Sequence, residues 1–264
     1  LINHPDADEY TLESVRFANA GGDSLPLDTI HRFEEQFDTK LMEGYGLTET
    51  APTTHANAPD ERRKGSIGKS LPGVESKVVN RRFEEKPSVE EGPVEFGGDG
   101  EYDYDEVVGE IVISGPNVMK GYYELPRENE NAFTEADGKH WFHTGDLGYR
   151  DEDSFFYVVD REKHMIVTGG YNVYPREVEE LLFEHPDVAE AAVVGVPDER
   201  KGETVKAYVV TQPDSSVTPD EIREYCLENL AEYKHPREVK FVDELPRTAS
   251  GKVQKFKLGG NEDA

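Results

Sequence analysis

The sequence predicts an α/β segment that continues into a β-rich segment, followed by a small α+β domain. Three patterns lead to this prediction. Apolar strand segments and one helical segment alternate up to about residue 60, and short alternating segments divided by Gly and Pro run from 64 to 159. Helical and strand patterns alternate again after Asp160. A chain of 264 residues is long enough for one large domain or two ordinary ones.

The α/β segment is expected to contain two strands and a helix between them. "SVRFANAGG" (14–22) is an apolar strand that runs into a glycine turn. "LPLDTIHRFEEQF" (25–37) has helical spacing with Pro26 near its start, and "TKLMEGYGLTET" (39–50) is a strand that leads into a loop.

The β-rich segment combines short strands with a strongly acidic stretch. Strands are expected within 65–79, 109–115 and 154–160, where the sequences are "GSIGKSLPGVESKVV", "GEIVISG" and "SFFYVVD". The acidic stretch, 80–106, is expected to be a solvated hairpin loop or surface insertion, and a contact with a partner is the alternative interpretation.

The last hundred residues predict a compact α+β domain whose boundary lies near Asp160. A hairpin is expected at 161–175, and helices are expected at 175–186 and 218–230. Thr218 followed three residues later by Glu221 forms a capping box at the start of the second helix. The strands are "VAEAAVVGV", "ETVKAYVVT" and "REVKFVDEL".

Charge and composition exclude several classes of protein. The formal net charge of −27 argues against nucleic-acid binding through a basic surface, and it predicts a soluble protein from the cytoplasm of a halophilic organism. No run of 18 apolar residues predicts a transmembrane helix, and the first residues do not resemble a secretion signal. The single cysteine, Cys226, is expected to be an inert core thiol.

Five motifs contain the residue types that nucleotide chemistry needs. Two glycines in "AGGDS" (20–24) allow a flat ligand to approach the backbone, and "GYGLTET" (44–50) supplies an aromatic ring, hydroxyls and a carboxylate that could bind Mg²⁺. Asp146 of "WFHTGDLG" is expected in a tight turn, where it could accept ribose hydroxyls or cap the turn. "DREKHMIVTGGYN" (160–172) and "PRTASGK" (246–252) add cations and a glycine pair. Each motif alone is also compatible with an ordinary turn, linker or solvated loop.

Other catalytic classes lack their motifs. The sequence contains no G-x-S-x-G, no G-x-x-x-x-G-K-[ST] and no G-x-G-x-x-G, which argues against a hydrolase, a Walker-type ATPase and a dehydrogenase. The histidines, including His140 and His143, show no metal-ligand spacing.

Together with "GEIVISGPNVMKGYY" (109–123), the five motifs resemble the later core motifs of the adenylate-forming superfamily. They follow one another along the chain in the family's order, over residues ~18 to ~255. Within it, "WFHTGD" and "GGYNVYPREVEE" are most similar to fatty-acyl or aryl-CoA ligases. The resemblance implies a C-terminal portion of the large AMP-binding domain at 1–159, with an α/β piece at 1–60 and a β-barrel-like subdomain at 61–159. A hinge at Asp160 and a mobile α+β lid at 161–264 complete the implied fold.

The resemblance also implies an AMP-forming acyl-CoA synthetase, which uses ATP, Mg²⁺ and CoA and activates a carboxylic acid, with a fatty acid as the first expectation. The implied site residues lie in both domains. They are Gly21, Gly22 and Asp23 near the adenine and acyl carbonyl, Tyr45 on the adenine, Thr48 on phosphate, Glu49 on Mg²⁺, Asp146 and Arg161 on the ribose, Lys252 as the catalytic cation, and Gly169 and Gly170 at the pantetheine tunnel.

Lys252 sits in a Pro-, hydroxyl- and Gly-containing segment that predicts a mobile loop. The family's domain alternation implies that this lysine enters the site for adenylate formation and leaves it for thioester formation.

One family element is not found in the sequence. The Ser/Thr/Gly-rich phosphate loop that the family carries upstream is absent, which predicts a partial chain with exposed apolar edges and leaves the activity of this chain alone undecided. An aryl or other small-acid CoA ligase, and a non-catalytic remnant that acts as a binding module, remain the alternatives.

Overall fold

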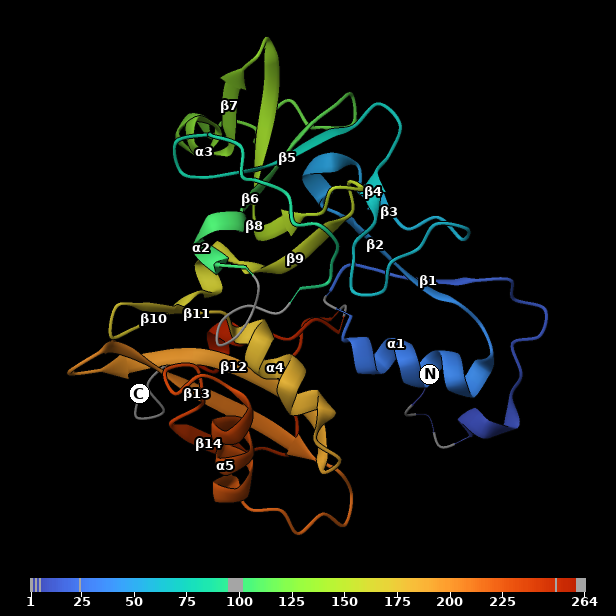
Figure 1. Ribbon diagram of the computed structural model, residues 1–264, viewed down its shortest axis with the longest axis vertical. Coiled ribbons are helices and arrows are strands. Elements are labelled where there is room, and N and C mark those ends of the chain that lie inside the picture. Colours follow the sequence, from blue (N-terminus) through green and yellow to red (C-terminus); the bar gives the residue numbers. More distant parts are fainter. Residues whose placement is uncertain are drawn as a thin grey trace. The chain divides into compact units, whose positions relative to one another are not determined.

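The computed structural model describes residues 2, 4, 6–23, 25–94, 102–249 and 251–259, and it divides into two compact units, Leu1–Val158 and Val159–Ala264 (Figure 1). Ser24 and Ser250, which belong to two of the motifs, lie outside the described residues, as do residues 95–101 of the acidic stretch. Within the described ranges no helix is both long enough and apolar enough to cross a lipid bilayer.

The first unit begins with a four-stranded sheet in the order β1-β2-β3-β4. Its strands are β1 (Ala18–Ala20), β2 (Leu41–Gly46), β3 (Thr53–Ala56) and β4 (Lys69–Ser70). β1 and β2 are parallel, so a crossover must join them, and helix α1 (Leu27–Phe37) supplies it (Figure 1). This confirms the predicted strand–helix–strand order, although the first strand is only three residues long.

The face of α1 that points to the sheet is apolar and buried, whereas the residues before β1 leave apolar side chains exposed. Ile30, Phe33 and Phe37 are buried and pack with Leu41 at the start of β2. They recur at the three- and four-residue spacing of one helix face, which explains why the helix was predictable. Before β1, in contrast, Tyr10, Val15 and Phe17 are exposed.

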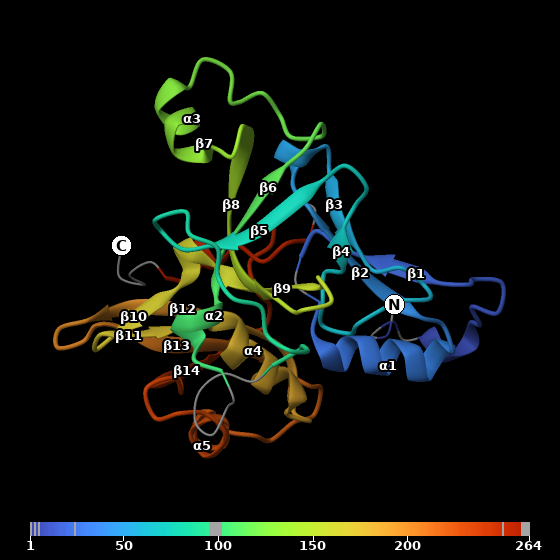
Figure 2. The ribbon, with the colours of Figure 1, turned by 45° about the horizontal axis from the view of Figure 1, so that its top comes forward.

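The second sheet of the first unit has the strand order β5-β6-β8-β7, with β9 paired to β8. Its elements are β5 (Glu75–Val79), β6 (Gly109–Ser114), β7 (Phe133–Ala136), β8 (Lys139–Arg150) and β9 (Phe156–Arg161). Along the described strands this sheet stays open, which corrects the expected barrel. β7 pairs with the first part of β8, beyond most of the β6–β8 pairing, and together they form an extended arm (Figure 2).

The described part of the acidic stretch starts with a hairpin turn and exposes many of its side chains, as predicted, but two of its apolar residues pack against the sheet. The chain reverses after Asn80, and the ring of Phe83 lies 6.2 Å from that of buried Trp141. Val89 is fully buried and forms a bridge with Asp151. A one-turn helix, α2 (Tyr104–Val107), then leads into β6. Two apolar residues among many acidic ones therefore attach the segment to the core.

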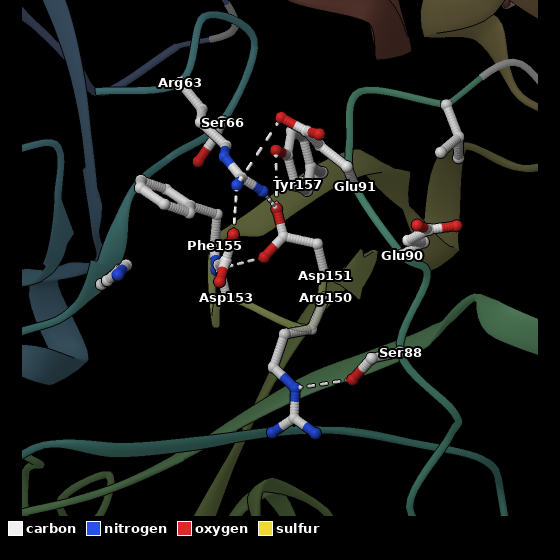
Figure 3. A network of polar contacts seen from close by, with 12 residues as sticks. Arg63, Ser66, Ser88, Glu90, Glu91, Arg150, Asp151, Asp153, Phe155 and Tyr157 are labelled. Carbon is white, nitrogen blue, oxygen red and sulfur yellow. Dashed lines mark hydrogen bonds and ion pairs between the residues drawn. The ribbon is translucent and has the colours of Figure 1, made fainter. Parts of the chain in front are cut away.

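A polar network fixes the turn between β8 and β9 (Figure 3). The carboxylate of Asp151 is fully buried, and it accepts hydrogen bonds from Phe155 N (2.9 Å), the Tyr157 hydroxyl (3.0 Å) and Arg63. The same guanidinium binds Asp153 and lies 4.7 Å from the centre of the Phe155 ring. Because a buried carboxylate needs several partners, this cluster specifies how the 63–66 segment joins the sheet.

The second unit is a five-stranded sheet covered on one face by two helices. β11, β10, β13 and β12 follow one another across the sheet, and β14 runs parallel to β13. The elements are β10 (Ile166–Thr168), β11 (Tyr171–Val173), α4 (Pro175–Glu184), β12 (Val188–Asp198), β13 (Gly202–Thr211), α5 (Pro219–Asn229) and β14 (Glu238–Phe241). Figure 1 shows α4 and α5 beside each other on the sheet, and their buried residues join one core. The predicted hairpin, helices and strands of this unit are confirmed.

Local sequence explains which helices were predictable. The side chain of Thr218 accepts from the backbone N–H of Glu221, and Glu221 binds back to Thr218 N, which is the predicted capping box of α5. Cys226 on this helix is buried and free, as expected. Helix α3 (Pro126–Ala132) was not predicted, since its sequence "PRENENA" is polar on all sides and none of its residues is buried. Short 3₁₀ turns occur at Ala7–Glu9, Thr48–Thr50, Glu162–His164 and Lys255–Lys257.

Candidate functional site

In the first unit the candidate residues begin at the carboxyl ends of the parallel strands β1 and β2, the edge where α/β sheets bind ligands. A Cβ atom on Gly21 would lie 2.7 Å from the carbonyl oxygen of Gly44, so only glycine lets the two strand ends approach this closely. Gly22 has φ of +92°, which glycine also favours, and Asp23 is exposed. The "AGGDS" turn therefore lies directly beside the "GYGLTET" loop.

A hydrogen bond joins two of the predicted ligand residues, Tyr45 and Asp146, although they are 101 positions apart in the sequence. The Tyr45 hydroxyl donates to Asp146 Oδ2 at 2.5 Å. Asp146 is only 3% exposed, whereas Tyr45 is half-buried with its ring 5.7 Å from that of His55. The sequence predicted both residues but gave no indication that they bind each other.

Asp146 does not lie in a tight turn, as the sequence suggested, but inside strand β8. The pairing of β8 with β6 is irregular here, and Gly145 has φ of +70°. Gly145 N donates to Glu110 Oε1 at 2.8 Å, and the Thr144 hydroxyl donates to Ile111 O at 2.6 Å. This bulge redirects the strand at Asp146, a common use of bulges near binding sites.

Glu110 has a second partner, His143, whose Nδ1 lies 2.7 Å from Glu110 Oε2. The other ring nitrogen of His143 lies 2.8 Å from the Thr134 hydroxyl. Glu110 therefore holds the bulge from β6, a role that was missed in the sequence although "GEIVISG" was recognised as a motif.

The loop with Thr48 and Glu49 is held by the segment that follows β6. Thr48 is exposed and Glu49 half-buried. The Tyr122 hydroxyl donates to Glu49 Oε1 at 2.9 Å, and Met119 N donates to Glu49 O at 2.8 Å. The Asn117 amide donates to Thr50 O at 2.8 Å. These contacts were also missed, and the available signal was again the quoted motif "GPNVMKGYY".

The Glu49 carboxylate is a suitable ligand for Mg²⁺, but it does not make a complete metal site by itself. Mg²⁺ prefers oxygen ligands and is commonly held by one or two carboxylates together with substrate phosphates. The described part of the chain contains no group of three or more His, Cys, Asp or Glu residues that could hold a metal ion. Glu49 would therefore need phosphate oxygens to complete the coordination.

In the second unit Asp160 lies near the end of β9 and is 6% exposed. Its carboxylate accepts from Arg161 N at 2.6 Å and from Arg176 N at 2.9 Å, and His164 Nδ1 lies 3.4 Å away. Burial alone would raise the pKa of Asp160, but the bond to His164, the charge of Lys255 and the two amides together lower it. Since Arg176 is in the first turn of α4, Asp160 also satisfies an N–H that the helix leaves unpaired.

The glycine pair forms the two-residue turn between β10 and β11. Gly169 and Gly170 have φ of +58° and +89°, and a Cβ atom on either would meet nothing within 4 Å. The turn conformation, and not crowding within this unit, is therefore what favours glycine here. Arg161 is half-buried, and Tyr171, which follows the turn, is 58% exposed.

Lys252 is exposed and follows a short hydrogen-bonded turn, and the mobility of this segment stays a prediction. Arg247 and Val253 form a β-bridge, and Thr248 N donates to Lys252 O at 2.8 Å. Lys252 N in turn lies 3.1 Å from the Thr248 hydroxyl. The lysine is thus presented on a closed turn.

Two family models match parts of this chain. The model of the AMP-binding enzyme family matches residues 1–123, and that of the AMP-binding enzyme C-terminal domain matches residues 177–252. A long-chain-fatty-acid–CoA ligase from Bacillus subtilis (strain 168) is 41% identical over 98% of this chain and 43% of its own length. A sulfoacetate–CoA ligase from Cupriavidus necator is 42% identical over 98% of this chain and 47% of its own length.

A solved structure is similar over the same range. ATP-bound MatB from Rhodopseudomonas palustris superposes with a TM-score of 0.84 at 34% identity, and the match covers 98% of this chain and 48% of MatB. The chain therefore belongs to the AMP-binding, or adenylate-forming, enzyme family. It spans about half the length of the relatives it matches.

Proposed function

We propose that the chain is part of an AMP-forming acyl-CoA synthetase. Such an enzyme joins a carboxylic acid to ATP, which gives an acyl-adenylate and pyrophosphate, and the CoA thiol then displaces AMP to form a thioester. The observation that most supports this proposal is the Tyr45–Asp146 hydrogen bond beside the glycine turn, because it couples an aromatic platform to a buried carboxylate.

The first unit would bind the nucleotide. The adenine stacks on Tyr45 and lies along the backbone of Gly21, Gly22 and Asp23, where the two glycines have no side chain and permit close approach. Asp146 accepts the ribose hydroxyls, and its bond to the Tyr45 hydroxyl fixes the base and the sugar relative to each other.

Groups in both units would neutralise the negative charge of the reacting carboxylate and phosphate. The reaction brings a carboxylate to a phosphate, so its catalysis depends on positioning and on cations. Thr48 contacts phosphate and Glu49 would hold Mg²⁺, which neutralises phosphate charge when bound. Arg161 reaches the ribose, and Lys252 approaches the carboxylate and the α-phosphate, a task that suits a compact ammonium on a long stem.

The second half-reaction would use a different arrangement of the same residues. Asp160 serves as the hinge, and rotation about it withdraws Lys252 and brings Gly169 and Gly170 to the pantetheine tunnel. The exposed glycine turn presents no side chain that would obstruct a narrow passage. Domain alternation of this kind separates two steps that need different catalytic groups.

Fatty acids are the substrates we favour, since one relative is named a long-chain-fatty-acid–CoA ligase, and we infer a cytoplasmic location. A small-acid CoA ligase is the second candidate, because the sulfoacetate–CoA ligase is equally similar. For the full-length parent, a non-catalytic binding module is disfavoured because Glu49, Asp146, Arg161 and Lys252 are present together.

A binding experiment tests the nucleotide site in this chain. Calorimetric titration with a non-hydrolysable acyl-adenylate analogue in molar KCl should show saturable binding that Asp146→Ala abolishes. Asp137→Ala, at an exposed carboxylate in the turn between β7 and β8, is the matched control and should bind normally. Equal binding by wild type and Asp146→Ala would contradict the assigned site.

Kinetics of the full-length gene product test the activity. Lys252→Ala should slow ATP-dependent adenylate formation by about 100-fold or more, the scale expected for loss of one transition-state charge contact. Thioester formation from a pre-made acyl-adenylate should remain near the wild-type rate. Equal losses in both half-reactions would contradict the role given to Lys252.

A further inference from the structure

The segment Arg247–Val253, which we call the Lys252 finger, is closed by its own backbone. In addition to the Arg247–Val253 bridge, Thr248 N binds Lys252 O at 2.8 Å and Gly251 N binds Thr248 O at 2.9 Å. Gly251 has φ of +90°, a conformation that glycine adopts without strain. These bonds hold together the described residues on the two sides of Ser250, which itself lies outside the described residues.

The side chain of Arg247 forms one hydrogen bond inside the finger and a second one to the sheet. One guanidinium nitrogen donates to Gly251 O, the carbonyl next to Lys252, at 2.6 Å. Another donates to Glu190 on β12 at 2.7 Å. The planar fork of arginine makes both bonds at once, which a lysine at this position could not do with the same geometry.

The chain after the finger is anchored by a second cation, Lys255. Its ammonium lies 2.6 Å from Glu179 on α4, and the same carboxylate oxygen accepts from Val193 N at 2.6 Å. Glu179 is only 8% exposed, and the charge of Lys255 also acts on Asp160. This contact therefore links the base of the finger to the residue proposed as the hinge.

Backbone contacts complete the attachment on both sides of the finger. Gln254 N donates to Pro246 O at 2.7 Å, so the two ends of the finger are held together. The buried hydroxyl of Tyr208 donates to Leu258 O at 2.8 Å, which fixes the chain that leaves it.

We propose that Arg247 and Lys255 are positioning residues that hold the Lys252 finger as a fixed projection of the second unit. Lys252 then reaches the reacting groups only when the whole unit moves, and no loop has to fold at that moment. The inference rests on the proposed function for the role of Lys252, whereas the geometry of the finger does not depend on it. A preformed cation avoids the loss of conformational freedom that ordering a loop during the reaction would require.

Hydrogen exchange of this chain tests the preformed finger without any activity. The amide hydrogens of Thr248 and Gly251 should be protected in the wild type, and Arg247→Met should increase their exchange at least several-fold. Lys257→Met, an exposed lysine close to the finger, is the matched control and should leave both amides protected. Unprotected amides in the wild type would overturn the proposal.

Half-reaction kinetics of the full-length gene product test the positioning role. Arg247→Met should slow adenylate formation about 10- to 100-fold, since a displacement of ~1 Å can cost that much, with the KM for ATP and thioester formation unchanged. Because Lys255→Met alone would leave a buried carboxylate unpaired, the anchor is tested with the double variant Lys255→Met/Glu179→Gln. It should show the same selective loss, and Lys255→Arg should restore the rate.

The outcomes separate this proposal from the proposed function. If the wild type forms the adenylate and Lys252→Ala abolishes it, but Arg247→Met and the double variant behave like Lys257→Met, the positioning role is wrong and the function stands. Equal losses in both half-reactions would reduce Arg247 and Lys255 to a structural role and overturn the proposal. If the wild type forms no adenylate, the proposed function fails, and hydrogen exchange still decides whether the finger is preformed.

Discussion

At the scale of single residues, Arg63 is the partner on which the buried carboxylate of Asp151 depends (Figure 3). Removal of one partner of a buried ion pair leaves a charge without compensation, which typically costs about 3–5 kcal/mol. We expect Arg63→Met to lower the free energy of unfolding of the first unit by about 3 kcal/mol. Urea unfolding followed by the fluorescence of Trp141, the only tryptophan, measures it.

A double-mutant cycle separates the ion pair from general packing around it. Asp151→Asn removes the charge but keeps the shape, so Arg63→Met/Asp151→Asn should be more stable than Arg63→Met alone. Arg82→Met, in an exposed turn, is the control and should change the stability by less than about 0.5 kcal/mol. A double variant that is less stable than Arg63→Met would refute the charge-based explanation.

His55 gives the first unit a pH dependence. Burial lowers the pKa of its imidazole from 6.5 to about 3, so the folded state keeps it neutral while the unfolded state protonates it. The unfolded state thus binds more protons between these values, and the stability present above pH 6.5 is lost as the pH falls toward 3. One pKa unit corresponds to about 1.4 kcal/mol, so the loss between pH 6.5 and 5 should be about 2 kcal/mol.

The variant His55→Gln isolates this effect from that of the many carboxylates. Glutamine is neutral at every pH, so the stability difference between wild type and variant should shrink as the pH falls from 7.5 to 5.0. Urea titrations at several pH values, again monitored through Trp141, provide the comparison. A difference that is constant or grows on acidification would contradict a buried neutral histidine.

At the scale of helices and strands, the sequence predicted the elements whose information is local. Helix α5 has its capping box, and α1 has apolar residues at helical spacing, so both were predicted within two residues at each end. Helix α3 has no apolar face, and the strand that holds Asp146 is interrupted by a bulge at Gly145. Those two features depend on contacts with other parts of the chain, and the spacing of apolar residues in the sequence does not indicate such contacts.

The cap of α5 can be tested in isolation. Thr218→Ala should destabilise the helix by about 1 kcal/mol, because the N–H of Glu221 loses its acceptor. Amide hydrogen exchange along α5 measures the change within the second unit. Thr218→Asn should restore protection, and Glu224→Ala, at an exposed position of the same helix, should have little effect. Unchanged exchange in Thr218→Ala would mean that tertiary packing alone holds the helix.

At the scale of the whole molecule, the sequence proposes residues for the site but does not show how they are held together. The motifs identified Tyr45, Glu49 and Asp146 one by one. The bonds that orient them, from Tyr45 to Asp146 and from Tyr122 to Glu49, join positions 101 and 73 residues apart. Such pairs follow from the tertiary fold, and a single sequence contains no local signal for them. The assigned roles themselves stay predictions until the binding and kinetic experiments are made.

The net charge of −27 has a consequence for the whole molecule that does not depend on any site. Exposed carboxylates repel one another across the surface, and salt shortens the range of this repulsion from ~10 Å at 0.1 M to ~3 Å at 1 M. We therefore expect the midpoint of thermal unfolding to rise as KCl increases from 0.05 M to 1 M. Potassium chloride is preferred to sulfate, because sulfate also strengthens hydrophobic burial.

The shape of this salt dependence tests the predicted halophilic origin. Simple screening of surface charges is nearly complete by ~1 M salt, so a midpoint that reaches a plateau there indicates screening alone. A midpoint that continues to rise into the molar range would favour a protein adapted to a salt-rich cytoplasm. Sucrose at matched osmolality is the control for exclusion of solutes from the surface. A midpoint that falls with added KCl would show that the ion pairs, such as Arg62–Glu34 and Lys64–Glu34, stabilise the fold more than the net charge destabilises it.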